Sequence, residues 1–404
     1  MSAEFTRFDQ PQPVRGVRLA SAAAGIRRPD RKDVLLVELA PGTRTAAVFT
    51  RNRFCAAPVT VARENLATAS PRLLVFNAGN ANAGTGTQGL ADARQVTAAI
   101  AAAGDCAEAE VLPFSTGVIG ERLPSDKLCA QAQALHRALD ENNWLDGATA
   151  IMTTDTVAKI ASIRVSIDGS SYQISGLCKG SGMIHPNMAT MLAFVATDAP
   201  LDASCLDAIL ATAVATTFNR ITVDGDTSTN DACVLSATGA AGGERMHQDH
   251  PHVAAITEGI TRVCEILAQA IVRDGEGATK FVEIEVVGPN EADCHAVANT
   301  VALSPLVKTA LFASDPNWGR ILAAVGRAPV ASLELDAISI WLGDCQIVEH
   351  GEPCPGYDEA HADQVMAREE IKIRIIIGAE HASCRVWTCD FSYDYVRINA
   401  EYRS

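Results

Sequence analysis

The feature that most constrains this chain is a repeated alternation between two hydrophobic patterns. Six segments are rich in β-branched residues, and many of them end on glycine, which is typical of strands: 33–40, 72–79, 161–169, 280–288, 337–343 and 371–379. Four others have the period and the start or stop signals of helices: 88–103, 124–140, 201–217 and 252–273. The mixture predicts an α/β or α+β fold in which helices cover sheets.

The length of 404 residues is enough for two or three packed units with sizeable cores. Two stretches, 140–147 and 240–252, are polar and rich in turn-forming residues. Each fits either a linker or a surface loop, and the loop is the safer interpretation.

Composition excludes several classes of protein. No stretch approaches 18 uninterrupted apolar residues, so we expect no membrane span, and the N-terminus lacks the apolar region of a secretory signal. The net charge of −15, from 33 basic and 48 acidic residues, argues against a nucleic-acid partner. Twelve cysteines form no CxxC or zinc-type grouping, which favours reduced thiols and a cytoplasmic localisation.

Two short motifs point to ligands that we reject. Gly84, Gly86 and Gly89 match the glycine spacing of a dinucleotide site, but an irregular stretch separates them from the preceding strand. The run that starts at Asp224 begins like a calcium loop, yet it has Thr229 where the loop needs glycine and Leu235 where it needs glutamate. A turn rich in local hydrogen bonds explains the second run better.

Two glycine-containing loops leave alternatives open. Residues 113–124 place Gly117 and Gly120 where backbone N–H groups can point outward together, as an oxyanion site requires, although an ordinary strand-to-helix loop has the same composition. Glu276 stands between two glycines, and it is either an exposed loop acid or a carboxylate presented to a cationic ligand.

The stretch 178–195 passes from a Gly-, Pro- and Asn-containing loop into an apolar strand, with Thr190 at the junction. A threonine at the head of a strand is usually structural. As a nucleophile it needs a base, and a cut before Thr190 would supply one in its own α-amine. A strained Ala189–Thr190 peptide, attacked by the Thr190 hydroxyl, is the corresponding hypothesis.

At these residues the chain resembles the ornithine acetyltransferase family, also called the glutamate N-acetyltransferase family, of the cyclic arginine pathway. The resemblance extends over nearly the whole chain, in segments 77–86, 115–124, 151–156, 179–192, 218–231, 274–280, 315–320 and 395–404. It implies self-cleavage into an α fragment (1–189) and a β fragment (190–404). It also implies a helix–sheet–sheet–helix sandwich and a dimer of αβ pairs, that is, a heterotetramer.

The resemblance assigns roles to particular residues. Thr190 would be the nucleophile, its freed α-amine the base, and Thr116 with Gly117 the oxyanion hole. The substrate-binding residues would be Lys179, Glu276, Asn399, Ser404 and one of Thr153 and Thr154. The family usually has threonine where this chain has Ser404, and the hydroxyl group is kept.

The implied reaction moves an acetyl group from N2-acetylornithine to glutamate by a ping-pong route through an acetyl-threonine ester. It needs no metal or organic cofactor, and acetyl-CoA as an additional donor is left open. One alternative is a related N-terminal-nucleophile amidohydrolase or aminopeptidase that passes the acyl group to water. Another is an uncut, non-catalytic binding protein.

Overall fold

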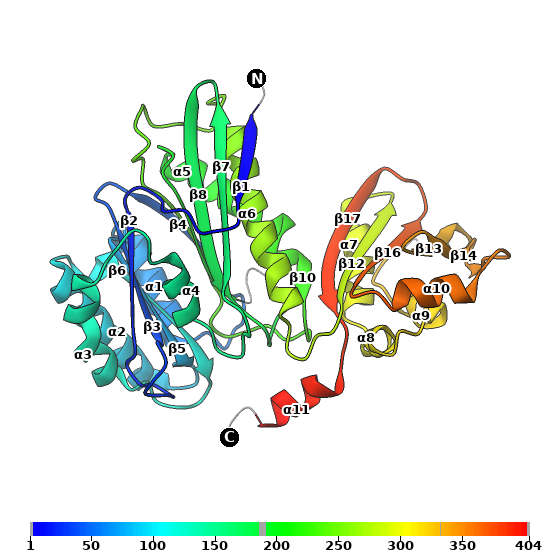
Figure 1. The fold of residues 1–404 in the computed structure, drawn as a ribbon, viewed down its shortest axis with the longest axis horizontal. Coiled ribbons are helices and arrows are strands. Elements are labelled where there is room, and N and C mark those ends of the chain that lie inside the picture. The colour runs from blue at the N-terminus through cyan, green and yellow to red at the C-terminus, as the bar shows by residue number, and fades with distance from the viewer. Residues whose placement is uncertain (1–2, 186–190, 332, 402–404) are drawn as a thin grey trace. The chain divides into compact units, whose positions relative to one another are not determined.

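The chain forms two compact units (Figure 1). The structure is a computed structural model that describes residues 3–185, 191–331 and 333–401. The first unit comprises Met1–Gly180, His185–Asn219 and Thr227–Ile271, and the second comprises Ser181–Ile184, Arg220–Asp226 and Val272–Ser404. The expected fragments, 1–189 and 190–404, have other bounds, and the cut between them stays a prediction.

Two sheets form the centre of the first unit. Among its described residues, the larger sheet has the strand order β1-β7-β8-β9-β11-β4 and the smaller one β2-β3-β5-β6. The strands of the larger sheet are β1 (Glu4–Phe8), β4 (Arg44–Phe49), β7 (Lys159–Ile167), β8 (Ser170–Lys179), β9 (Leu192–Thr197) and β11 (Ala232–Ala237). Those of the smaller sheet are β2 (Val17–Ala22), β3 (Val34–Leu39), β5 (Leu73–Asn80) and β6 (Val111–Val118).

Helices cover both outer faces of this pair of sheets (Figure 1). α2 (Gly86–Gly104) and α3 (Ser125–Arg137) pack on the smaller sheet, whereas α5 (Ala203–Thr216) and α6 (Val253–Arg273) pack on the larger one. α1 (Ala57–Thr68) lies against β6, and α4 (Trp144–Ala150) contributes to the core between the sheets. The expected helix–sheet–sheet–helix sandwich is therefore confirmed for this unit.

The sequence of β3 shows why a layered unit forms. Leu35, Val37 and Leu39 face the core between the sheets, while Val34 and Leu36 face α2 and α3. A strand that is buried on both faces needs an almost continuous apolar run, and β3 has one. Burial of each of these side chains contributes about 1.5–3 kcal/mol relative to exposure.

The second unit contains one sheet, with the order β10-β17-β12-β16-β13-β14-β15 among its described residues. Its strands are β10 (Ile221–Thr222), β12 (Phe281–Gly288), β13 (Ile338–Leu342), β14 (Cys345–Glu349), β15 (Glu352–Pro353), β16 (Glu370–Ile377) and β17 (Ala382–Cys389). Its helices are α7 (Glu291–Ala302), α8 (Pro305–Phe312), α9 (Trp318–Gly326), α10 (Glu359–Met366) and α11 (Tyr393–Glu401).

In this second sheet the two faces differ, because one packs on helices and the other carries charge. Val282, Ile284 and Val286 of β12 point into the core, whereas Glu283 and Glu285 point to the opposite face. There both glutamates pair with Lys372 of β16, at 3.5 and 2.9 Å. The alternating sequence of β12 is the period-two pattern of a strand with one buried face.

All six strands and all four helices expected from the sequence are present, and the loop at 240–252 is confirmed. The loop expected at 140–147 is wrong in its second half, where α4 begins at Trp144. The Trp144 ring is completely buried and stacks on Phe194, with ring centroids 5.9 Å apart. The polar residues around Trp144 concealed this anchor, because its packing partner lies 50 positions away in the chain.

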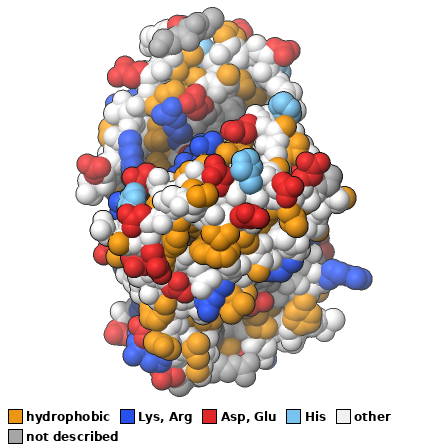
Figure 2. Space-filling model, turned by 90° about the vertical axis from the view of Figure 1, so that its right-hand side faces the viewer, with side chains coloured by type: hydrophobic (Ala, Val, Ile, Leu, Met, Phe, Trp, Pro, Cys, Tyr) orange, Lys and Arg blue, Asp and Glu red, His pale blue; other side chains and the backbone are white. Residues whose placement is uncertain are grey.

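The face shown in Figure 2 presents acidic, basic and apolar side chains interspersed with one another. None of the helices in residues 3–185, 191–331 and 333–401 has the length and apolar character needed to cross a membrane. All twelve cysteines are free thiols.

Candidate functional site

Thr116 and Gly117 lie near the C-terminal end of β6, where the strand emerges from the core. Residues 111–115 are buried, and these two are the first in the strand to be partly exposed. Gly117 has φ +133°, and β6 runs parallel to β5 with a register irregularity at Gly79 and Asn80. A β-carbon on Gly117 would lie 2.5 Å from the Asn80 nitrogen and even closer to the Gly79 carbonyl carbon. The backbone at the predicted oxyanion site therefore requires glycine.

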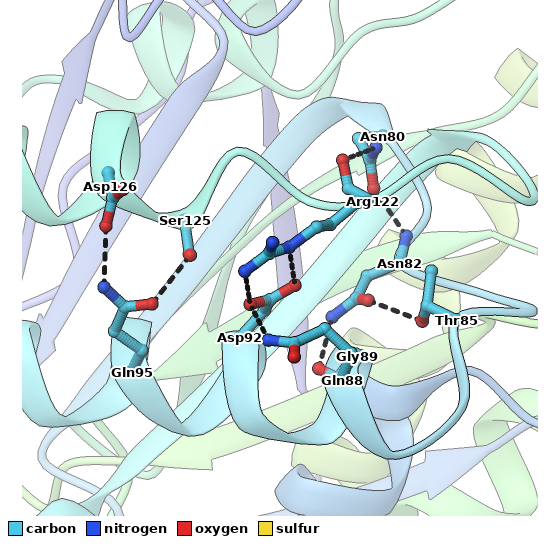
Figure 3. A network of polar contacts seen from close by, with 10 residues as sticks. All are labelled: Asn80, Asn82, Thr85, Gln88, Gly89, Asp92, Gln95, Arg122, Ser125 and Asp126. Atoms are coloured by element: carbon cyan, nitrogen blue, oxygen red, sulfur yellow. Dashed lines mark hydrogen bonds and ion pairs between the residues drawn. The ribbon is translucent and has the colours of Figure 1, made fainter.

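A network of side-chain hydrogen bonds braces the loop that follows β6 (Figure 3). The Asn80 amide donates to the carbonyl oxygens of Glu121 (3.2 Å) and Arg122 (3.1 Å). The Arg122 guanidinium donates to both oxygens of the buried Asp92 carboxylate, each at 3.2 Å. Asn82 receives a hydrogen bond from Thr85 and donates to the Gly89 carbonyl of α2. The glycine run 84–89 is thus part of a structural support.

Asn230 joins three segments at the same place. Its amide donates to the Ala81 carbonyl (2.6 Å) and to the Ser115 carbonyl (2.9 Å), next to Thr116. Its side-chain oxygen accepts from the Thr229 hydroxyl at 2.6 Å. With all three hydrogen bonds made and only 5% of the residue exposed, Asn230 holds β6 and the 80–83 segment together.

Lys179 ends β8 within a buried group of charges. Asp155 accepts hydrogen bonds from Lys159 Nζ (2.6 Å), the Gly180 N–H (2.8 Å) and the Thr153 N–H (2.9 Å). Burial alone would raise the pKa of Asp155, but the charges of Lys179 and Lys159 and the Gly180 N–H outweigh it and lower the pKa to about 2. Asp155 is therefore ionised at neutral pH, and the Lys179 ammonium lies within its electrostatic reach.

Thr153 and Thr154 precede Asp155, and both are half-buried. The backbone at Thr153 is held by Asp155 and, through the Met152 carbonyl, by Arg31 (2.9 Å). Substrate contact by either threonine stays a prediction.

Asp155→Asn should lower the free energy of unfolding by about 3–5 kcal/mol, because the buried Lys159 ammonium loses this counter-charge. The folded pKa lies below the unfolded value, so the carboxylate stabilises the fold above about pH 4, and this contribution disappears as the pH falls towards 2. The free energy of unfolding, measured with urea at a series of pH values, should therefore fall less steeply between about pH 4 and pH 2 in the variant than in the wild type. Asp146→Asn, which breaks a half-exposed pair with Lys32, is the matched control and should cost at most about 1 kcal/mol. Equal losses in both variants would contradict this assignment.

In the second unit, Glu276 and Asn399 are brought together. The Asn399 amide of α11 donates to Glu276 Oε2 at 2.8 Å, and the Glu276 N–H donates to the Ser181 carbonyl at 2.9 Å. Glu276 is only 7% exposed, so the alternative of an exposed loop acid is wrong. A β-carbon on Gly182 would approach Glu276 Oε1 to 2.5 Å, so the glycine at that position makes room for the carboxylate. Burial, with the charges of Asp224 and Glu276, raises the pKa of the Tyr395 phenol.

The Asp224 turn combines one local hydrogen bond with two from a distant segment of the chain. Asp224 accepts from the N–H groups of Met183 (2.6 Å), Ile184 (2.9 Å) and Asp226 (3.1 Å). The Asp226 contact agrees with the locally bonded turn that we preferred to a calcium loop, whereas the other two join the turn to residues 183 and 184. Among the residues that the structure describes, no group of three or more His, Cys, Asp or Glu side chains is arranged to hold a metal ion.

Three predicted residues, Ala189, Thr190 and Ser404, lie outside the described residues. Of the others, the structure groups Lys179 with Asp155, next to Thr153, and Glu276 with Asn399. Sequence reasoning did not identify the supporting residues Asp155, Lys159 and Asn230. The four-residue spacing of Asp155 and Lys159 was the available signal for the first two, whereas the two carbonyl groups that accept from the Asn230 amide lie more than 100 positions away.

Comparison with known proteins supplies the family. The family model described as "ArgJ family" matches residues 18–404. The arginine biosynthesis bifunctional protein ArgJ of Methylococcus capsulatus is 55% identical over 97% of this chain and 96% of its own length. The protein of the same name from Psychrobacter arcticus is 51% identical over 97% of each chain.

A solved structure also matches. The crystal structure of the arginine biosynthesis bifunctional protein ArgJ from Bacillus halodurans is 40% identical over 51% of this chain and 96% of that chain, with a TM-score of 0.49. The family match, by contrast, extends from residue 18 to the last residue, and the two curated relatives exceed 50% identity over almost their whole lengths. This chain is therefore an enzyme that belongs to the ArgJ family.

Proposed function

We propose that this protein transfers the acetyl group of N2-acetylornithine to glutamate, through an acetyl ester on Thr190, after its chain has cleaved itself between Ala189 and Thr190. The observation that carries the proposal is the match to the ArgJ family over residues 18–404. The relatives from M. capsulatus and P. arcticus are named arginine biosynthesis bifunctional proteins, which fits a role in this biosynthesis and a second activity with acetyl-CoA as donor.

The charges of the two candidate groups suit the substrate. N2-acetylornithine carries an α-carboxylate and a δ-ammonium group. Lys179 provides a cation for the carboxylate, and Glu276, oriented by Asn399, provides an anion for the ammonium. One of Thr153 and Thr154, together with Ser404, would add hydroxyl contacts to the same substrate.

The chemistry follows from these roles. The Thr190 hydroxyl attacks the acetyl carbonyl carbon while the α-amine of Thr190 takes its proton, and the oxyanion is stabilised by Thr116 and Gly117. The C–N bond breaks, the proton passes to the leaving nitrogen, and ornithine departs. The amine of glutamate then attacks the ester, which releases N-acetylglutamate and restores the threonine. Every step uses protein groups alone, without a metal or an organic cofactor. The α and β fragments of one chain would remain together as an αβ pair. Two such pairs would form a dimer.

Assays with each acetyl donor separately test this proposal. We expect acetylation of glutamate with N2-acetylornithine. Double-reciprocal plots of initial velocity, with both substrates varied, should give parallel lines, as ping-pong kinetics require. Release of free acetate without dependence on glutamate would instead indicate a hydrolase. Acetylation with acetyl-CoA in a parallel assay would show the second activity, and its absence would restrict the enzyme to the ornithine-linked transfer.

A further inference from the structure

Asp231 is a buried carboxyl group for which the proposed reaction has no role. It is 2% exposed and lies in the first unit, immediately before β11. Within the described part of the chain, no hydrogen-bond partner reaches its Oδ2 atom. An ionised carboxylate with a buried, unpartnered oxygen is strongly disfavoured, because nothing replaces the water lost on burial. The geometry at Asp231 therefore favours the neutral acid.

The strand register brings Asp231 close to the predicted substrate residues of this unit. Lys179 of β8 is paired with Leu192 of β9, and Leu192 is paired in turn with Ala232 of β11. The Ala232 N–H donates to the Met191 carbonyl at 3.0 Å. Asp231 thus adjoins the row of residues in which Lys179 lies, and the neighbouring Asn230 contacts Ser115 beside Thr116.

Lys179 on β8 is the charged group whose field acts on Asp231. Lys179 also acts on Asp155, which lies before β7 and pairs with Lys159 of β7. Burial raises the pKa of Asp231 well above its usual value, and the opposing effects of a Ser228 hydrogen bond and of the Lys179 charge do not cancel this rise. Asp155 is ionised and forms its ion pair with Lys159.

We propose that Asp231 is held as a neutral acid beside Lys179, so that this cluster keeps one net positive charge for the α-carboxylate of an amino-acid substrate. Two ammonium groups and the single carboxylate of Asp155 leave a charge of +1, which matches one substrate carboxylate. If Asp231 were ionised, the charges of the two lysines and the two aspartates would sum to zero. The charge of Lys179 would then already be balanced before the substrate binds. Asp231 is a positioning residue in this scheme, since it acts through Lys179. The inference rests on the proposed function for the identity of the carboxylate.

The first test is the stability of Asp231→Asn, and it is independent of any substrate. Wild-type Asp231 is ionised in the unfolded chain above about pH 4 and neutral in the folded chain. The equilibrium constant for folding therefore falls by up to about tenfold for each unit by which the pH rises. The asparagine variant lacks this penalty. Its urea midpoint should exceed that of the wild type at pH 7.5, and the difference should shrink as the pH falls towards 5.

A matched control lies at the other end of the same strands. Asp198, after β9, is also buried, but it accepts hydrogen bonds from Arg15 (2.9 Å) and from the Gln173 N–H (2.8 Å). Asp198→Asn should lower the midpoint at pH 7.5. A lower midpoint for Asp231→Asn as well would show that an ionised Asp231 stabilises the fold, and would overturn the inference.

The second test is calorimetric binding of ornithine in two buffers of different ionisation enthalpy, which counts the protons taken up. Because Asp231 must be neutral when the carboxylate binds, wild-type protein should take up additional protons at every pH at which Asp231 is partly ionised in the free protein. Asp231→Asn should bind ornithine within about twofold of wild type at pH 7 and lack this extra uptake. Lys179→Met should bind at least about tenfold more weakly.

The possible failures can be told apart. If wild-type protein binds no ornithine, the proposed substrate is wrong, while the stability test still decides the state of Asp231. If ornithine binds but Asp231→Asn shows the wild-type proton uptake, or binds as weakly as Lys179→Met, the inference about Asp231 is overturned and the proposed function stands.

Discussion

Thr190→Ala should yield one uncut chain of about 42.6 kDa on a denaturing gel, with acetyl transfer reduced by roughly 10⁶-fold, as when other catalytic nucleophiles are removed. Alanine has no hydroxyl to attack the preceding peptide bond and none to accept the acetyl group. One substitution therefore removes both the cleavage and the turnover. Gel electrophoresis, intact-mass measurement and the N2-acetylornithine assay read the two effects separately.

Thr190→Ser is the matched control, because it keeps the hydroxyl and loses only the methyl group. It should still give two fragments, more slowly, and keep measurable activity. Two fragments from Thr190→Ala, or wild-type turnover by an uncut chain, would refute the mechanism with its threonine nucleophile.

Gly117→Ala should destabilise the fold by about 3 kcal/mol and lower kcat by roughly 10²–10³-fold in the protein that remains folded. The added β-carbon meets backbone atoms of Gly79 and Asn80, which no side-chain rotation can relieve. β6 must then move away from β5, and the predicted oxyanion donors move with it. Urea unfolding measures the first effect, and kcat in the absence of denaturant measures the second.

Gly120→Ala separates backbone conformation from steric conflict. Gly120 also has a positive φ, of +85°, but a β-carbon there meets no atom within 4 Å. This control should lose only about 1–2 kcal/mol and keep kcat within a few-fold of wild type. A kcat for Gly117→Ala equal to that of Gly120→Ala would remove Gly117 from the oxyanion site.

Several features of the site could be predicted from the residues alone. The strand-to-helix loop considered for residues 113–124 agrees with β6, which ends at Val118, and with α3, which begins at Ser125. The irregular loop expected from residue 178 is wrong at its start, because Cys178 and Lys179 are the last residues of β8. The Asp224 turn was also predictable, since its hydrogen bonds include one to Asp226, only two positions away. Local sequence carries such information because strand periodicity, turn chemistry and glycine conformation depend on neighbouring residues.

Burial could not be predicted in the same way. Glu276, flanked by two glycines, looked unshielded, yet Asn399, Ser181 and Gly182 enclose it, and all three lie more than 90 positions away in the chain. Trp144 was hidden in a polar stretch for the same reason. Whether a side chain meets water depends on which distant segments fold over it.

By itself, the sequence determined the layered α/β architecture and the family resemblance that the comparisons confirmed. Only the tertiary structure decided the charge states. Asp155 and Asp231 are the same residue type, both buried, but the first meets two lysines and two N–H groups while the second has an oxygen without a partner. Their ionisation differs because Coulomb energy and desolvation depend on distances that the fold sets between residues far apart in the chain.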